Sequence, residues 1–189
     1  IRLSDTVRKV VHGTRGGLLS NAGLGDTINA LIGRRGFDEL ELDLAVVATD
    51  IERHRRVIFT SWRVARRIDR GELHRYLPPP QEAKPGCETL VIGGFPDVGL
   101  AVRASCAVPG IFLPVEIEDM RLVDGGIVDQ VPVDVVRAMG AGLVIGVSLS
   151  LSYMPLRVRS AAGATAATIA ILGIHQHRRS LDLADIGFQ

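Results

Sequence analysis

Apolar runs bounded by polar turns predict a β-sheet in the middle of the chain. Residues 42–49 (LDLAVVAT) and 56–61 (RVIFTS) are rich in β-branched side chains, which is typical of buried strands. They form a predicted hairpin with residues 51–55 as its turn, and residues 89–92 add another short strand. Asp50 ends the first strand, where an aspartate is more often a turn residue than part of a functional site.

A second apolar pattern brings an aspartate into a turn of two glycines. Residues 122–126 (LVDGG) form a short predicted strand that ends at Asp124, at the edge where open α/β sheets bind ligands. Residues 132–140 predict a helix, because they begin with proline and end with glycine. Residues 143–147 (LVIGV) are typical of a strand buried on both faces. One face of the helix is predicted to consist of Val133, Val136 and Met139, and the other of Asp134 and Arg137.

The two glycines allow more than one role for Asp124. A residue without Cβ can adopt positive φ, or it can let a substrate or another backbone come close. An aspartate in such a turn can be functional, or it can only stabilise the turn by accepting hydrogen bonds from backbone amides. For a lone Asp-Gly pair the second role is commoner by roughly three to one, so the surrounding motifs decide.

Capping residues predict helices on both sides of these strands. The 189 residues are expected to form a single domain, with a helical lead-in at 1–36, the core sheet at 37–150 and a C-terminal helix within 151–189. The individual helices are predicted at residues 5–11 after Ser4, 27–32 between Asp26 and Gly33, 98–106 after Asp97, and 157–179.

Composition excludes several classes of function. Charged residues make up 23% of the chain and apolar types 47%, as in ordinary globular proteins, and the net charge of +1 gives no indication of nucleic acid. No run reaches the roughly 18 apolar residues of a membrane-spanning helix. Cys87 and Cys106 fit neither a metal site nor a disulfide framework, and His175 and His177 lie on different faces of a predicted helix. We expect a cytoplasmic protein without a metal or cofactor.

Residues 53–75 hold eight arginines against one aspartate and one glutamate. Trp62, Ala65 and Ile68 recur among them at helical spacing. One interpretation is a basic amphipathic segment that contacts an anionic membrane surface, with Trp62 at the interface. The other, which we favour, is a solvated helix face with its apolar stripe on the core. Aromatic residues form only 4% of the chain, too few for the stacking surfaces of a nucleic-acid-binding protein.

A glycine-rich loop at residues 13–17 (GTRGG) could bind an anion through its backbone amides. Phosphate-binding loops of this kind follow a strand, and no predicted strand leads into this one. We therefore favour a plain connector.

Three motifs occur in an order that is more specific than any of them alone. They are Ala-Ser-x-Ala-x-Pro-Gly at residues 104–110, Asp-Gly-Gly at 124–126 and Pro-Val-Asp at 132–134. The set resembles the C-terminal portion of the patatin-like phospholipase domain, over about residues 40–150. The resemblance implies a three-layer α/β/α sandwich with a mainly parallel sheet. It also implies a lipid acyl hydrolase with a serine–aspartate dyad.

The resemblance assigns a role to Asp124. The carboxylate of the dyad would accept the proton of the serine hydroxyl and later activate water, on a lipid or ester substrate and without a histidine. Gly125 and Gly126 complete its motif, and Ser105 would be a structural position outside the site. A carboxylate with an ordinary pKa is a weak base at neutral pH, so we expect Asp124 to be partly buried.

The chain departs from the family's pattern in one respect. It contains neither the glycine-rich oxyanion loop nor a Gly-x-Ser-x-Gly nucleophile motif; residues 146–150 (GVSLS) end in serine and follow the aspartate. We expect both motifs to lie upstream of Ile1, in a domain that is incomplete at its N-terminus, and this chain alone to be inactive. Two alternatives stay open: a degenerate scaffold in which Asp124 is a structural turn residue, and a different doubly wound domain that binds a small molecule.

Overall fold

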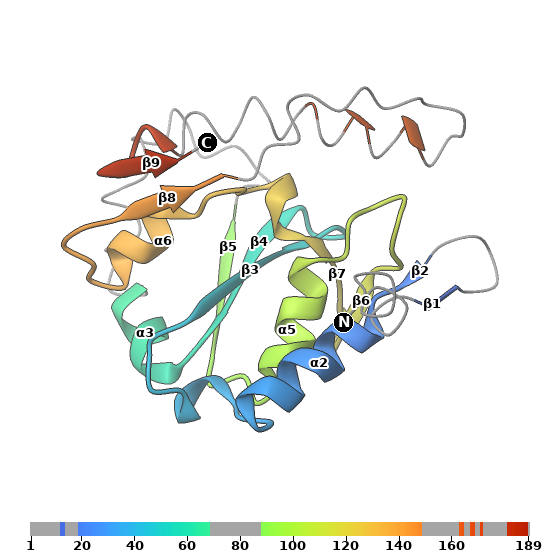
Figure 1. The fold of residues 1–189 in the computed structure, drawn as a ribbon, viewed down its shortest axis with the longest axis horizontal. Helices are drawn as coiled ribbons and strands as arrows, with labels where there is room; N and C mark the ends of the chain where they lie inside the picture. Colours follow the sequence, from blue (N-terminus) through green and yellow to red (C-terminus); the bar gives the residue numbers. More distant parts are fainter. Residues whose placement is uncertain are drawn as a thin grey trace, which may run out of the picture.

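The computed structural model describes residues 12–13, 19–68, 88–148 and 181–188, with short helical pieces at 163–164, 167–168 and 171. Within this part of the chain, a five-stranded sheet lies between helices (Figure 1). Its strands, in spatial order, are β5 (Thr89–Gly93), β4 (Arg55–Thr60), β3 (Ala45–Asp50), β7 (Met120–Asp124) and β6 (Val115–Ile117). The helices are α2 (Ala22–Ile32), α3 (Trp62–Arg67), α5 (Val98–Ser105) and α6 (Val133–Ala138), with 3-10 turns η1 (Phe37–Glu39) and η3 (Gly125–Ile127).

The sheet is mixed. β3 and β4 form the predicted hairpin, β7 pairs antiparallel with both β3 and β6, and β4 and β5 are parallel. The predicted α/β class is confirmed, but the expectation of a mainly parallel sheet is wrong for the described strands. The reason is the length of the connections. Residues 51–54 and 118–119 are short enough only for antiparallel neighbours, whereas the crossover from β4 to β5 is long.

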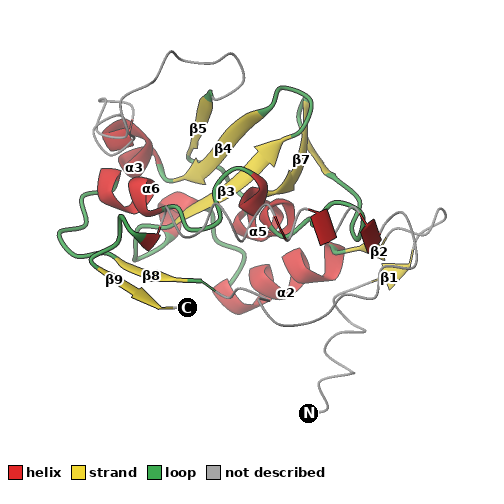
Figure 2. Cartoon of the chain, turned by 90° about the horizontal axis from the view of Figure 1, so that it is seen from above, coloured by secondary structure: helices red, strands yellow, loops and turns green. Residues whose placement is uncertain are grey.

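Side chains alternate between the two faces of β3 and β4 and build a core on each face. Ala48, Val57 and Phe59 belong to the core that α5 covers, and Val47 and Ile58 belong to the core that α3 and α6 cover. Figures 1 and 2 show α2 and α5 on one side of the sheet and α3 and α6 on the other. This arrangement is the predicted three-layer α/β/α sandwich.

Helices α2 and α5 cross at two glycines. A Cβ added to Gly99 would lie 2.3 Å from the carbonyl oxygen of Gly25 and 2.6 Å from the side chain of Asn29. The Gly99 N–H donates to Asn29 Oδ1 at 2.9 Å, and Asn29 Nδ2 donates to Asp97 Oδ1 at 2.8 Å. Asp97 also caps α5, as predicted, by accepting a hydrogen bond from the Leu100 N–H. The crossing therefore depends on the absence of a side chain at Gly99.

This crossing also explains where α2 begins. The prediction of a helix over residues 27–32 capped by Asp26 is wrong at its start, because α2 begins at Ala22 and Asp26 lies inside it. Its end at Gly33, which has a left-handed conformation, is as predicted. Glycines in the first turns of a helix have low helix propensity. Here the close packing of α2 against α5 offsets this low propensity and extends the helix to Ala22.

Replacing Gly99 by alanine is expected to destabilise the fold by about 2–3 kcal/mol, because the new methyl group would overlap backbone and side-chain atoms of α2. Chemical denaturation of the full translation product of the reading frame measures this. Gly142→Ala is the matched control, since no atom lies within 4 Å of its added Cβ. Equal free energies of unfolding for the two variants would contradict the crossing described here.

The segment after the Asp-Gly-Gly turn differs from its prediction in two ways. In α6 the side chains in the sheet-facing core are Val135 and Ala138, whereas Val136, predicted for the buried face, is 36% exposed. β8 (Ile145–Val147) pairs with β9 (Ile186–Phe188) and not with the described central sheet. Ile145 and Val147 are 55% and 59% exposed, so the prediction of a strand buried on both faces is wrong. Of the predicted helix 157–179, residues 163–164, 167–168 and 171 are helical and the others lie outside the described residues.

Candidate active site

A cavity of about 390 Å³ lies beside the Asp-Gly-Gly turn. The start of β3, the end of α5 and the loop after β7 form its walls. Its lining residues are Ala45, Val46, Val47, Val102, Ser105, Asp124, Gly125, Gly126, Asp129, Gln130 and Pro132. The three predicted motif residues therefore share one cavity with Ser105, the only hydroxyl-bearing side chain that the described residues contribute to its lining.

The backbone of Asp124 is fixed on both sides. Its N–H donates to the carbonyl of Ala107 at 3.0 Å, and its carbonyl accepts a hydrogen bond from the Thr49 hydroxyl at 2.9 Å. In the side chain, Oδ1 accepts the N–H of Gly126 at 2.7 Å. Within the described part of the chain, Oδ2 has no hydrogen-bond donor. The carboxylate of this cavity-lining residue is thus held by one oxygen only, among the described residues.

Burial sets the protonation behaviour of this carboxylate. The half-buried position raises the pKa of Asp124 above its ordinary value, and the hydrogen bond from the Gly126 N–H opposes part of that shift. A raised pKa makes the ionised carboxylate a stronger base than an exposed aspartate. The expected partial burial of Asp124 is therefore present.

The two glycines of the motif have different functions. A Cβ on Gly125 would lie 2.2 Å from the carbonyl oxygen of Val47 in the central strand, whereas a Cβ on Gly126 would meet only Asp124 Oδ1, at 3.0 Å, and Gln130 beyond it. Neither glycine has a positive φ. Of the two roles considered for these glycines, close approach of another backbone is the one that Gly125 performs.

A buried charge cluster adjoins the cavity through Asp129, and no pattern in the sequence indicated it. The guanidinium of Arg56 contacts Asp129 Oδ2 at 2.6 Å and Asp134 Oδ2 at 2.9 Å. The three side chains are 11%, 9% and 8% exposed. Burial and the neighbouring Asp134 raise the pKa of Asp129 to about 6, and Arg56 opposes that shift. The partners lie too far apart along the chain for a local motif to join them.

The pKa of Asp129 predicts a pH dependence of stability. Because this pKa is raised in the folded state, the folded protein binds more protons than the unfolded chain between about pH 4 and pH 6. Asp129 should therefore add about 1 kcal/mol to the free energy of unfolding when the pH falls from 7 to 5. Denaturation curves of the full translation product and its Asp129→Asn variant at both pH values measure this. An equal change in the free energy of unfolding between pH 7 and pH 5 in the two proteins would contradict the prediction.

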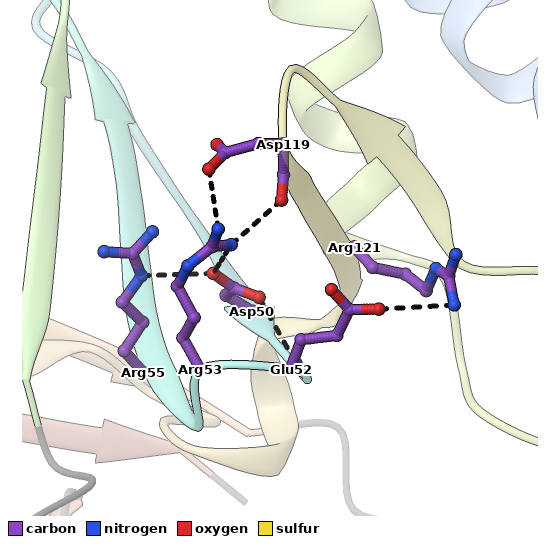
Figure 3. Close-up of polar contacts among 6 residues, drawn as sticks. All are labelled: Asp50, Glu52, Arg53, Arg55, Asp119 and Arg121. Atoms are coloured by element: carbon purple, nitrogen blue, oxygen red, sulfur yellow. Dashed lines mark hydrogen bonds and ion pairs between the residues drawn. The ribbon is translucent and has the colours of Figure 1, made fainter.

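Asp50 is a structural turn residue, as favoured from the sequence. Its side chain is fully buried, and its Oδ2 contacts Arg55 Nε at 3.1 Å and Arg53 Nη1 at 3.3 Å (Figure 3). Arg53 also binds the carboxylate of Asp119 at 2.6 Å, which connects the β3–β4 turn to the β6–β7 turn. In the antiparallel pair of β3 and β7, Asp124 lies opposite Ala48 and Asp50 lies opposite Leu122, so Asp50 is two positions along β3 from the residue that pairs with Asp124.

The described arginines of segment 53–75 largely pair with aspartates. Arg63 and Arg67 contact Asp43, so together with the three arginines already described, five of the six described arginines in this segment form ion pairs. Ala65 and Ile68 are buried as an apolar stripe, and Trp62 is 58% exposed. These pairings favour the solvated helix face, and contact with an anionic membrane remains a proposal.

The other candidate groups add no nucleophile or metal site among the described residues. Partial burial raises the pKa of the Cys106 thiol, and the nearby charge of Asp124 adds to the shift, so the thiol is a poor nucleophile. Among the residues that the structure covers, no cluster of three metal-ligating side chains occurs. No helix in the same residues is long and apolar enough to cross a membrane. Most of loop 13–17, together with Cys87, His175 and His177, lies outside the described residues.

The fold and the site define an α/β/α protein with a half-buried carboxylate at the end of a central strand. A family model for the patatin-like phospholipases matches residues 8–137. This match covers more than half of the chain, which therefore belongs to the patatin-like phospholipase family, as the sequence motifs indicated.

Relatives among curated proteins match over shorter segments. An uncharacterised NTE family protein of Mycobacterium bovis is 44% identical over 50 residues, which are 26% of this chain and 14% of that protein, and one from Mycobacterium tuberculosis matches equally. Another NTE family protein of M. bovis is 42% identical over 55 residues, which are 29% of this chain and 9% of that protein. The matched segment spans less than a sixth of the length of these relatives.

Proposed function

We propose that the chain is part of a lipid acyl hydrolase in which Asp124 is the proton acceptor of a serine–aspartate dyad. The observation that carries the proposal is the geometry of the carboxylate. Oδ1 is held by the Gly126 N–H at 2.7 Å, Oδ2 has no hydrogen-bond donor among the described residues, and Asp124 lines the cavity. Since the sequence has no Gly-x-Ser-x-Gly, the nucleophilic serine would come from polypeptide that these 189 residues do not include.

The chemistry requires the carboxylate twice. In the first half-reaction the serine oxygen attacks the ester carbonyl while Oδ2 of Asp124 takes the hydroxyl proton. The tetrahedral intermediate then expels the alcohol, which receives that proton, and leaves an acyl-enzyme. In the second half-reaction Oδ2 takes a proton from water, the hydroxide attacks the acyl carbonyl, and the serine oxygen leaves with the proton. Backbone amides outside this chain would stabilise the oxyanion in both steps.

The burial of Asp124 and the hydrogen bonds that fix it both support this role. Burial raises the pKa of Asp124 above its ordinary value, which makes its carboxylate a stronger base than that of an exposed aspartate. The hydrogen bond from Gly126 and the two backbone bonds of Asp124 fix the direction of the carboxylate before substrate binds. A fixed base does not lose free energy to reorientation in the transition state.

The alternative is a degenerate scaffold in which Asp124 only stabilises its turn. The hydrogen bond between Oδ1 and the Gly126 N–H favours this alternative, because it is the bond such a turn residue makes. An asparagine side chain at this position could make the same bond. The Asp124→Asn variant therefore separates the two functions, since it retains the turn and removes the base.

The test is ester hydrolysis by the full translation product of the reading frame that encodes this chain. Turnover of p-nitrophenyl esters of increasing acyl length is compared between the parent and Asp124→Asn. Loss of turnover with retention of the fold supports the dyad. Equal turnover in both proteins would assign Asp124 to the structural role.

A further inference from the structure

Arg56 connects three parts of the molecule that are distant in sequence. It lies on β4, and its guanidinium contacts Asp129 in the loop after η3 and Asp134 in the first turn of α6. Its Nε also donates to the Thr89 hydroxyl on β5 at 3.3 Å. The contact with Asp134 is an ion pair without hydrogen-bond geometry, whereas the contact with Asp129 is a directed hydrogen bond.

The loop that Arg56 holds is the loop that orients Asp124. Residues 125–132 form one wall of the cavity, and within them the Asp129 N–H donates to the Gly125 carbonyl at 2.9 Å. Gly126, between these two residues, donates the N–H that binds Asp124 Oδ1. Holding Asp129 against β4 therefore restrains the one side-chain contact that sets the direction of the Asp124 carboxylate.

We propose that Arg56 is a positioning residue for Asp124: by binding Asp129 and Asp134 together, it fixes the loop whose Gly126 amide leaves Oδ2 directed into the cavity. The inference rests on the proposed role of Asp124 as the base. A guanidinium suits this task because its planar fork lets Nη1 make a directed hydrogen bond to Asp129 while Nη2 lies against Asp134, whereas a lysine ammonium is a single point charge. Removing it alone would leave two buried carboxylates without a counter-charge.

The experiment therefore uses two kinds of variant of the full translation product. Arg56→Lys keeps the charge and loses the fork. The triple variant Arg56→Met, Asp129→Asn, Asp134→Asn removes the charges together, so that no buried charge is left unpaired and the protein can fold. Arg63→Met is the control, because it removes an exposed arginine whose partner, Asp43, does not contact the cluster.

Three readouts are taken: a cooperative thermal transition, kcat and KM for ester hydrolysis, and the ¹H–¹⁵N resonance of Gly126. In the folded triple variant we expect kcat to fall about 100-fold, with KM within about twofold of the parent and the Gly126 resonance displaced. Arg56→Lys should have a kcat and a Gly126 resonance between those of the triple variant and those of the parent. The control should match the parent in every readout.

Two results would overturn the inference. One is a triple variant, or Arg56→Lys if the triple does not fold, with parental kcat and an unmoved Gly126 resonance. The other is a change in KM alone, which would place Arg56 in substrate binding. If Asp124→Asn hydrolyses as well as the parent, the proposed function fails, but the Gly126 resonance still decides whether Arg56 positions the Asp124 turn.

Discussion

Replacing Asp124 by asparagine is expected to lower kcat/KM for ester hydrolysis by between about 100-fold and 10,000-fold. The amide cannot accept the serine proton, and no other described carboxylate in the cavity can replace it, because Asp129 is bound to Arg56. The measurement is the hydrolysis of p-nitrophenyl esters by the full translation product. Asp119→Asn is the matched control, since Asp119 is an exposed aspartate in a remote turn and should leave turnover unchanged.

The same variant should not lose stability. Asparagine Oδ1 can still accept the Gly126 N–H, and a neutral amide avoids the cost of burying a charge. Because the pKa of Asp124 is raised in the folded state, the ionised carboxyl weakens the fold at neutral pH and its removal should maintain or increase the free energy of unfolding. Parental turnover, or lost turnover together with an unfolded protein, would not fit this account.

Replacing Gly125 by alanine is expected to cost about 3 kcal/mol or more of the free energy of unfolding. The added methyl group would lie 2.2 Å from the Val47 carbonyl oxygen. That oxygen belongs to the backbone of the central strand β3, so neither partner can move without breaking the sheet. Urea denaturation of the full translation product measures the change.

Gly126→Ala is the appropriate comparison for this variant. Its added Cβ meets a side-chain oxygen of Asp124 at 3.0 Å, which can move by a small rotation, so the expected loss of stability is within about 1 kcal/mol. The two neighbouring glycines should thus differ strongly. Similar losses in both variants would show that the motif's glycines serve only a common backbone conformation.

Short sequence patterns predicted the hairpin, the start of α5 and the position of Asp124. The hairpin of β3 and β4 follows from two β-branched runs around a polar turn, and the start of α5 follows from the cap at Asp97. The Asp-Gly-Gly motif with its surrounding motifs identified the family and placed Asp124 at a strand end. The hairpin turn, the helix cap and each motif consist of residues within a few positions of one another, and the order of the motifs can be followed along the chain.

Contacts between distant residues determined what the sequence could not predict. Asp134 was expected on the outer face of its helix, but pairing with Arg56 on β4 allows it to be buried. The early start of α2 depends on Gly99, which lies far along the chain from that helix. The apolar run in β8 was expected in the core, although an apolar run alone does not specify which strand it pairs with.

A crystal structure of the full translation product would test the central claim most directly, through the distance from Asp124 Oδ2 to the nearest serine hydroxyl contributed by polypeptide outside these 189 residues. The account predicts a serine Oγ within hydrogen-bond distance, about 2.6–3.2 Å, that enters the cavity opposite Gly125 and Gly126. An Oδ2 that instead accepts a backbone amide or an arginine, with no serine hydroxyl in the cavity other than that of Ser105, would contradict the dyad and leave Asp124 as a turn residue.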